Sequence, residues 1–299
     1  MKTITVFGAT GSQGGSVARS LLATGRHRVR AVTRKPASPP AQRLRQLGAE
    51  IVNADLASPP SLNAALLGAD AVFGVTSYWE HFAVEAAHGR NLIEAVAASN
   101  VEHFVFSTLE PVGKGSAGAL NCPHFDIKAG HEELTRRRGI PATFVHIAFY
   151  YENFLGFFPL RPAGDGSYEF SFPQGDTPLA AISVEDYGKI VAPLFDLAPN
   201  GAVVKAVGDE MPATGYAAVM AEVIGAPVRY RYVTREAYAA LDFPGAGEVA
   251  DMFEYYRLYM PRRREDLELC RTFAPGLQTF AAWAQRNAGK LRASIAQAA

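Results

Sequence analysis

The sequence predicts an α/β protein with a Rossmann-type, doubly wound parallel sheet and a smaller, mostly helical C-terminal lobe. Up to about residue 145, short β-branched runs alternate with stretches whose apolar residues recur at three and four positions. This alternation is typical of βα units that build a parallel sheet. The first run also leads directly into a glycine-rich turn, FGATGSQGG, and then into helical sequence. A strand, a glycine turn and a helix in this order are typical of the first unit of such a sheet.

Six candidate strands follow one another in the first half of the chain. Their sequences are ITVF, VRAVT, EIVNA, AVFGV, HFVFS and ATFVH. Helical stretches such as residues 16–25 and 82–100 separate them, and residues 36–42 are expected to form a loop that enters a helix. Near-continuous apolar strands of this kind are typical of parallel sheets with helices on both faces.

The pattern changes after residue 150, where aromatic and proline-rich sequence begins. A strand is expected at SYEFSF, followed by a helix that Ser183 would cap. GAVVKAV and VRYRYV are predicted to be strands on either side of a helix from about Thr214 to Ile224, and the tail from Thr234 should be mostly helical. We therefore expect a first domain over residues 1–150 and a smaller lobe over residues 151–299 that also returns elements to the first domain.

Composition and charge argue against several classes of protein. The chain has 29 basic and 29 acidic residues, so no net charge attracts nucleic acid or an anionic membrane. Its two cysteines, Cys122 and Cys270, lack the spacing of a zinc site, and no metal is expected. No apolar run reaches the roughly 20 residues that span a bilayer, and no signal-peptide pattern opens the sequence. The sequence thus favours a cytoplasmic protein without nucleic-acid or membrane partners.

The glycine-rich turn is expected to hold the pyrophosphate of a dinucleotide. Gly8 would permit a tight turn, Gly11 a close approach of the backbone to phosphate, and Gly14 close packing of helix on strand. Backbone N–H groups and the helix dipole would then face the anion. A glycine-rich turn without a ligand is the simpler alternative. The other contacts expected from this turn come from Thr10, Ser12 and Gln13.

The end of the second strand indicates which dinucleotide is bound. NAD-binding proteins place an acidic residue there for the ribose 2′-hydroxyl, whereas this strand ends in Thr33, Arg34 and Lys35. Arg34 and Lys35 would attract the 2′-phosphate of NADP(H), with a solvated charge pair as the alternative. Asp55, after the third strand, is placed to meet the adenine or else to cap the next turn, and its neighbour Leu56 is counted with the cofactor contacts.

Six motifs between the first strand and about residue 280 resemble one known family. They are FGATGSQGGSVARSLL, VTRKP, VTSYWE, HFDIK, FYYENF and DFPGAGEVADMFEYY. Together they resemble the NmrA-like family of atypical short-chain dehydrogenase/reductases, and most closely its NADPH-sensor, HSCARG-like branch. The resemblance implies an NADP(H) site whose nicotinamide end is lined by Tyr150, Tyr151, Glu152 and Asn153.

The helix NCPHFDIKAGHEEL corresponds to the catalytic helix of short-chain dehydrogenases, which carries a Tyr-x-x-x-Lys pair. His124 stands at the position of the proton-donating tyrosine and Lys128 at that of the lysine. Lys128 is expected to hydrogen-bond the nicotinamide ribose, and both residues are the catalytic candidates. His124 as an ordinary polar residue near a helix start is the alternative. Further hydroxyl groups for the cofactor follow the fourth strand at Thr76, Ser77 and Tyr78.

The missing tyrosine leaves two functions open. In the first, the protein is a redox sensor or regulator in which NADPH and NADP⁺ favour different conformations or partners. In the second, it is an NADPH-dependent reductase of a small carbonyl, quinone or other conjugated substrate, because hydride transfer itself needs only a positioned nicotinamide. We expect the sensor. A small aromatic substrate, a regulatory protein partner and an oligomeric state all remain open.

Overall fold

The computed structural model describes residues 1–197 and 200–298, which form two compact units. Unit 1 comprises Met1–Pro111, His124–Ile147 and Val184–Lys205, and unit 2 comprises Val112–Pro123, Ala148–Ser183 and Ala206–Ala299. The chain therefore returns to unit 1 after its first passage through unit 2. A division of roles at residue 150 stays a prediction.

Unit 1 is built on a seven-stranded sheet with the order β11-β6-β5-β4-β1-β2-β3. All six strands predicted for the first half of the chain are present, and each pairs in parallel with its neighbours. The seventh strand is the predicted GAVVKAV segment, which joins the edge beside β6. The strands are β1 (Thr3–Val6), β2 (Arg28–Thr33), β3 (Glu50–Asn53), β4 (Ala71–Gly74), β5 (His103–Thr108), β6 (Ala142–Ile147) and β11 (Val203–Ala206).

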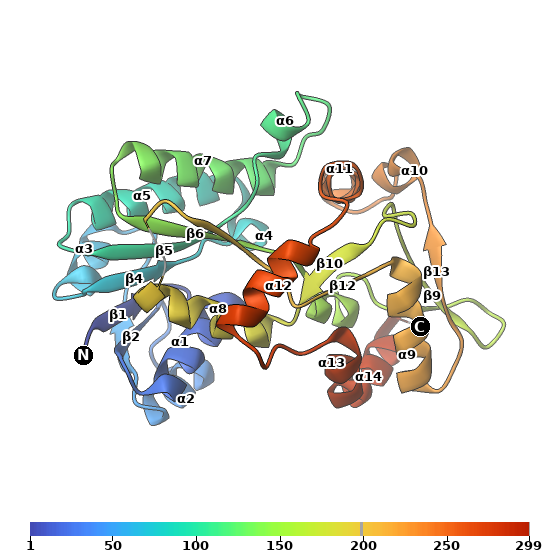
Figure 1. Cartoon of the computed structure of the whole chain (residues 1–299), viewed down its shortest axis with the longest axis horizontal. Coiled ribbons are helices and arrows are strands. Elements are labelled where there is room, and N and C mark those ends of the chain that lie inside the picture. The colour runs from blue at the N-terminus through green and yellow to red at the C-terminus, as the bar shows by residue number, and fades with distance from the viewer. Residues whose placement is uncertain (198–199, 299) are drawn as a thin grey trace. The chain divides into compact units, whose positions relative to one another are not determined.

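Helices cover both faces of this sheet, as the near-continuous apolar strands predict. Figure 1 shows α5 and α7 on one face, and α1 and α8 on the other. Two of the helices start at Pro39 and Pro59, where proline lacks an N–H that would have no helical partner. The helices are α1 (Ser12–Thr24), α2 (Pro39–Gln46), α3 (Pro59–Leu66), α4 (Tyr78–His81), α5 (Glu85–Ala97), α7 (Pro123–Arg137) and α8 (Val184–Leu197).

The core of unit 1 lies between the sheet and the helices. Leu62 of α3 and Leu92 of α5 are fully buried with Phe104 and Phe106 of β5, whose ring centroids are 4.6 Å apart. Burial of this many large apolar side chains fixes the helices against the sheet, at about 1.5–3 kcal/mol for each side chain removed from water. The carboxyl ends of the strands are thereby held in place.

Unit 2 contains two three-stranded sheets, β12-β10-β7 and β13-β9-β8, together with helices. The predicted strands SYEFSF and VRYRYV are β9 and β13, which pair in parallel. Its strands are β7 (Phe149–Tyr150), β8 (Arg161–Pro162), β9 (Tyr168–Phe172), β10 (Leu179–Ile182), β12 (Asp209–Met211) and β13 (Val228–Tyr232). Its helices are α6 (Val112–Gly115), α9 (Ala213–Ile224), α10 (Arg235–Ala239), α11 (Ala246–Tyr259), α12 (Arg264–Phe273), α13 (Phe280–Arg286) and α14 (Ala288–Ala298).

Aromatic side chains dominate the core of unit 2. Phe172 of β9 stacks on Phe253 of α11 with ring centroids 4.4 Å apart, and Phe149 of β7 contacts both rings. The aromatic sequence after residue 148 thus supplies packing for this unit. Across the described residues of both units, we find no helix with the length and apolar character needed to cross a bilayer.

Candidate functional site

The glycine turn joins β1 to α1 and is closed by a hydrogen bond of 2.9 Å from the Gly11 N–H to the Gly8 carbonyl. Gly8 has φ +66°, a left-handed conformation that side chains disfavour. A Cβ atom on Gly14 would lie 2.4 Å from the Gly8 carbonyl oxygen, so only glycine lets α1 approach β1 this closely. At Gly11 the same distance would be 3.3 Å. The tight turn and the close packing expected of Gly8 and Gly14 are therefore present.

The start of α1 is suited to an anion. Its first turn contains no acidic side chain, and Gly11 and Ser12 are exposed there. Such a helix N-terminus presents unpaired N–H groups and the positive end of the helix dipole. The Gln13 side chain is held by Ser107 at the end of β5, which donates a hydrogen bond of 2.6 Å to its amide oxygen.

The end of β2 carries the two predicted cations at the surface. Arg34 and Lys35 are both exposed, and the guanidinium of Arg34 lies 3.6 Å from a carboxylate oxygen of Glu80. An exposed pair of this kind contributes only about 0–1 kcal/mol, so Glu80 is a weak competitor for a phosphate. Thr33 is buried, and its hydroxyl contacts the Thr10 hydroxyl at 3.1 Å and accepts from the Lys35 N–H. These bonds join the glycine turn to the end of β2.

Asp55 forms a local turn after β3. One of its carboxylate oxygens accepts a hydrogen bond of 2.9 Å from the Ala57 N–H, which is the turn-capping use left open by the sequence. The neighbouring Leu56 is partly buried against the core, and its carbonyl accepts from the Asn91 side chain. The adenine contacts predicted for Asp55 and Leu56 stay predictions.

Lys128 of α7 forms a buried ion pair with Glu85, the first residue of α5. Its ammonium also donates to the Thr76 carbonyl at 2.9 Å and to the Thr76 hydroxyl at 3.0 Å, and that hydroxyl donates to Glu85. Glu85 is fully buried, and the Lys128 side chain is 11% exposed. Burial lowers the pKa of Lys128, while the adjacent Glu85 carboxylate opposes that shift.

Glu85 was not predicted as part of the site. It stands in the first turn of a helix, where an acidic residue is ordinarily explained by the helix dipole. The partner that gives it a different role is 43 residues away in the sequence, on another helix. Only the packed structure brings the two side chains together.

His124 lies in an aromatic cluster with the predicted Tyr78. Its ring centroid is 5.7 Å from that of Tyr78, 5.2 Å from that of Trp79 and 4.8 Å from that of Phe125. The His124 side chain is buried, whereas Trp79 is 38% and Phe82 49% exposed. The structure thus brings His124 and Tyr78 together, and the proton-donor role of His124 stays a prediction.

Residues 150–153 belong to unit 2, where they make contacts of their own. Tyr151 is fully buried, and its hydroxyl donates to the Gln278 carbonyl at 3.3 Å. One carboxylate oxygen of Glu152 accepts from the Ser183 hydroxyl and from the Trp283 indole N–H. These contacts give Tyr151 and Glu152 a packing role within the unit. The predicted role of Tyr150, Tyr151, Glu152 and Asn153 at the nicotinamide end stays a prediction.

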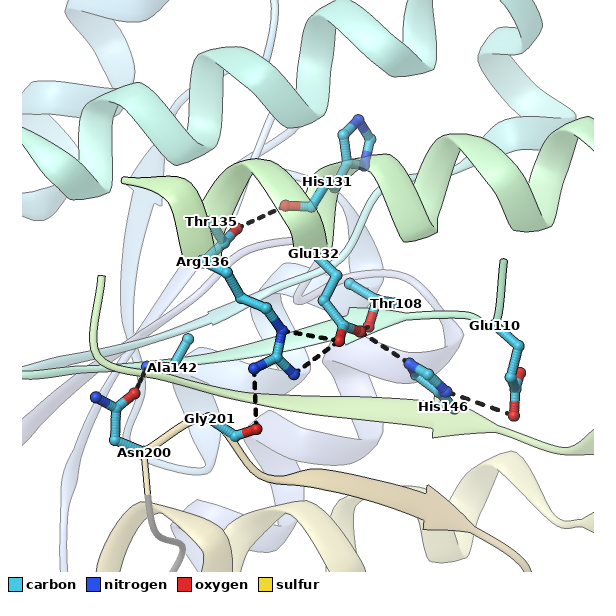
Figure 2. A network of polar contacts seen from close by, with 10 residues as sticks. All are labelled: Thr108, Glu110, His131, Glu132, Thr135, Arg136, Ala142, His146, Asn200 and Gly201. Atoms are coloured by element: carbon cyan, nitrogen blue, oxygen red, sulfur yellow. Dashed lines mark hydrogen bonds and ion pairs between the residues drawn. The ribbon is translucent and has the colours of Figure 1, made fainter. Parts of the chain in front are cut away.

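A second polar network on α7 was not predicted from the sequence (Figure 2). Glu132 accepts hydrogen bonds from Thr108, Arg136 and the imidazole of His146, and His146 also lies 3.4 Å from Glu110. The two carboxylates raise the pKa of His146 to about 9 against the effect of its burial. The bond to His146 likewise helps to hold the pKa of Glu132 below its usual value. Glu132 is one helical turn from Lys128, so the two networks share one face of α7.

The sheet order and the glycine turn between β1 and α1 define a Rossmann-like α/β fold. Residues 1–272 match the sequence model of the NmrA-like family, and the chain belongs to that family. An NmrA-like family domain-containing oxidoreductase of Aspergillus hancockii is 34% identical over 272 residues, covering 84% of this chain and 80% of the relative. One from Cladobotryum sp. is 32% identical over 274 residues, covering 83% and 81%.

Solved structures agree with this fold. NmrA, a negative transcriptional regulator, in complex with NADP has a TM-score of 0.79 at 20% identity, covering 95% of this chain and 94% of that one. An NADPH-dependent quinone oxidoreductase from Escherichia coli, complexed with NADPH, has a TM-score of 0.74 at 23% identity, covering 96% and 99%. The predicted fold class is therefore confirmed.

Proposed function

We propose that this chain binds NADP(H) at the carboxyl edge of the unit 1 sheet. The observation that carries the proposal is the glycine turn, in which Gly14 brings the N-terminus of α1 against β1. The exposed Arg34 and Lys35 at the end of β2 stand where an NAD-binding protein carries an acid, and they favour a 2′-phosphate. The NADP and NADPH complexes of the regulator and the quinone oxidoreductase support the same cofactor.

The parts of the dinucleotide are assigned to the predicted residues. The turn would hold the pyrophosphate, the two cations the 2′-phosphate, and Asp55 and Leu56 the adenine. Thr76–Tyr78 would line the ribose, and residues 150–153 the nicotinamide. Lys128 would hydrogen-bond the nicotinamide ribose.

The proposed role is that of a cytoplasmic redox sensor or regulator, as in the NADPH-sensor branch of the family. His124 stands at the position of the usual proton-donating tyrosine and is packed against the rings of Tyr78 and Trp79. A sensor must respond differently to NADPH and NADP⁺, because a ligand shifts a conformational equilibrium only by its differential affinity. A regulatory protein partner would distinguish the NADPH-bound conformation from the NADP⁺-bound one.

A second candidate is an NADPH-dependent reductase of a carbonyl, quinone or other conjugated compound. The observation in its favour is that the curated relatives from Aspergillus hancockii and Cladobotryum are named oxidoreductases. Without a tyrosine, the reduced substrate would take its proton from His124 or from water.

Two assays separate the candidates. In the first, the protein is incubated anaerobically with NADPH and a panel of quinones, enones and dyes, and the nicotinamide absorbance is followed. In the second, limited proteolysis is compared with NADPH and with NADP⁺. Turnover of a panel compound assigns the reductase. Different proteolysis patterns without turnover support the sensor, and identical patterns contradict it.

A further inference from the structure

The carboxylate of Glu85 is a buried charge that a ligand does not reach. Glu85 is fully buried, whereas the Lys128 side chain is 11% exposed. A bound cofactor therefore has access to Lys128 but none to the carboxylate. Any effect of Glu85 on a dinucleotide must pass through the groups that its carboxylate holds, which are the Lys128 ammonium and the Thr76 hydroxyl.

The three hydrogen-bond acceptors of the Lys128 ammonium are not equivalent. They are a carboxylate oxygen of Glu85, the Thr76 carbonyl at 2.9 Å and the Thr76 hydroxyl at 3.0 Å. The carboxylate adds the attraction of an opposite charge, which the neutral Thr76 oxygens do not supply. When the ammonium leaves the Thr76 hydroxyl, that hydroxyl still donates to Glu85 at 2.6 Å. A ribose hydroxyl can thus replace the Thr76 hydroxyl while the ion pair is kept.

The charge of Lys128 depends on the balance between burial and this carboxylate. Burial lowers the pKa of Lys128, and the charge of Glu85 and its hydrogen bond raise it again. Without the carboxylate, the effect of burial would be unopposed by Glu85, and the lysine would lose its proton at a lower pH. A neutral amine donates a weaker hydrogen bond than an ammonium does.

Other titratable groups on α5 and α7 do not take over the role of Glu85. Within one helical turn of the ion pair, α7 carries His124, His131 and Glu132, and α5 carries His88, with Arg90 in its next turn. Burial lowers the pKa of His131 to about 4, so this residue is neutral near pH 7. Glu132 accepts hydrogen bonds from Thr108, Arg136 and His146 in the other α7 network. The segment after β4 contributes the uncharged Thr76 to Lys128.

We propose that Glu85 is a positioning residue of the dinucleotide site, which keeps Lys128 charged and in place to hydrogen-bond the nicotinamide ribose. When the cofactor binds, a ribose hydroxyl replaces the Thr76 hydroxyl as an acceptor, and the ion pair with Glu85 stays intact. This inference rests on the proposed function, in which Lys128 contacts that ribose. It gives a role to a residue that the sequence did not assign to the site.

The test uses calorimetric titration of the full chain at pH 6 and pH 8.5 with NADPH and with adenosine 2′,5′-bisphosphate, which lacks the nicotinamide ribose. The ratio of the two affinities isolates the contribution of the nicotinamide half. In Glu85→Gln, this ratio should be about 3–10-fold lower than in wild type at pH 8.5, because a neutral lysine donates the weaker bond. The deficit should shrink at pH 6, where the lysine regains its proton. Glu85→Asp keeps the charge, so its deficit at pH 8.5 should be smaller than that of Glu85→Gln.

Equal ratios in Glu85→Gln and wild type at pH 8.5 would overturn the proposal, and so would a deficit of the same size at both pH values, which altered packing alone would produce. Glu132→Gln is the matched control, because it removes a carboxylate from the other α7 network, and its ratio should stay within about twofold of wild type. The same pH-dependent deficit in this control would also overturn the proposal.

A second measurement decides if Glu85→Gln does not fold. In wild-type protein with ¹⁵N-labelled lysine, the Lys128 side-chain signal is assigned through Lys128→Arg. With NADPH bound, it should be that of an ammonium at pH 7.5, and the signal of a neutral amine would overturn the proposal. Failure of the proposed function has a different result, because the wild-type protein would then bind neither compound, or Lys128→Met would leave the affinity ratio unchanged.

Discussion

Gly11 and Gly14 of the β1–α1 turn differ in how closely an added Cβ atom would approach its neighbours. An added Cβ on Gly14 would meet the backbone of Gly8 at 2.4 Å, a contact that neither residue can relieve without moving α1 away from β1. At Gly11 the nearest atom, the Gly8 carbonyl oxygen, would be 3.3 Å away, which is a tight contact but one that a small backbone shift relieves, and the backbone there is extended, as β-branched residues prefer. The two positions should therefore respond differently to substitution.

Gly11→Val is expected to fold and to lose the dinucleotide. The added side chain would occupy the space through which pyrophosphate approaches the backbone, while circular dichroism should stay near wild type. Gly14→Ala is the matched variant, and we expect it to lower the free energy of unfolding by about 1–3 kcal/mol through overpacking. Wild-type NADPH affinity in Gly11→Val would contradict the placement of the phosphate.

The variant His124→Phe tests the role of the imidazole as a proton donor while it keeps an aromatic ring in the cluster. Phenylalanine keeps an aromatic ring among Tyr78, Trp79 and Phe125, so NADPH affinity should change less than about threefold. If a panel compound is reduced and His124 donates the proton, turnover should fall about 10²–10⁴-fold. Unchanged turnover would assign the proton to water, and a large loss of NADPH affinity would contradict the account of this cluster.

At the scale of elements, α7 organises one face of the unit 1 sheet. Lys128 joins α7 to α5 and to Thr76 in the segment after β4, and Glu132 joins α7 to β5 and β6. Close packing on α5 requires Gly89, because a Cβ atom there would lie 2.1 Å from the His131 ring. The polar contacts of Lys128 and Glu132, together with the close approach at Gly89, thus fix the position of α7.

The pairing of α7 with β6 should depend on pH. The pKa of His146 is raised from 6.5 to about 9 in the folded state, so its charge stabilises the fold fully below pH 6.5 and loses this effect as pH rises through 9. The shift corresponds to about 3 kcal/mol as an order of magnitude. We expect urea unfolding at pH 6 to show a larger stability difference between wild type and His146→Gln than at pH 9.5. An equal difference at both pH values would contradict a charged His146.

At the scale of the whole molecule, the sequence predicted the sheet well because the information is local. Periodicity located all six strands of the first half, and the glycine spacing located the turn. It did not locate the partner of Lys128, because Glu85 has an ordinary place in a helix start and meets the lysine only after α5 and α7 pack. The Glu132–His146 network was missed for the same reason, since each residue is unremarkable in its own element.

The functional roles of individual residues are harder to predict from the local sequence pattern than the strands are. Residues 150–153 were assigned to the cofactor by resemblance, and within unit 2 Tyr151 and Glu152 contact Gln278, Ser183 and Trp283. Family membership is established by the match over residues 1–272, while the choice between sensor and reductase depends on chemistry that the fold does not determine.

Calorimetric titration with NADPH and NADH tests the central claim most directly. If Arg34 and Lys35 receive the 2′-phosphate, NADPH should bind at least about tenfold more tightly than NADH, a difference of about 1.4 kcal/mol. Arg34→Ala should remove much of that difference by weakening NADPH binding and leaving NADH binding unchanged. Equal affinities for NADPH and NADH in the wild-type protein, or no binding of either, would contradict the account.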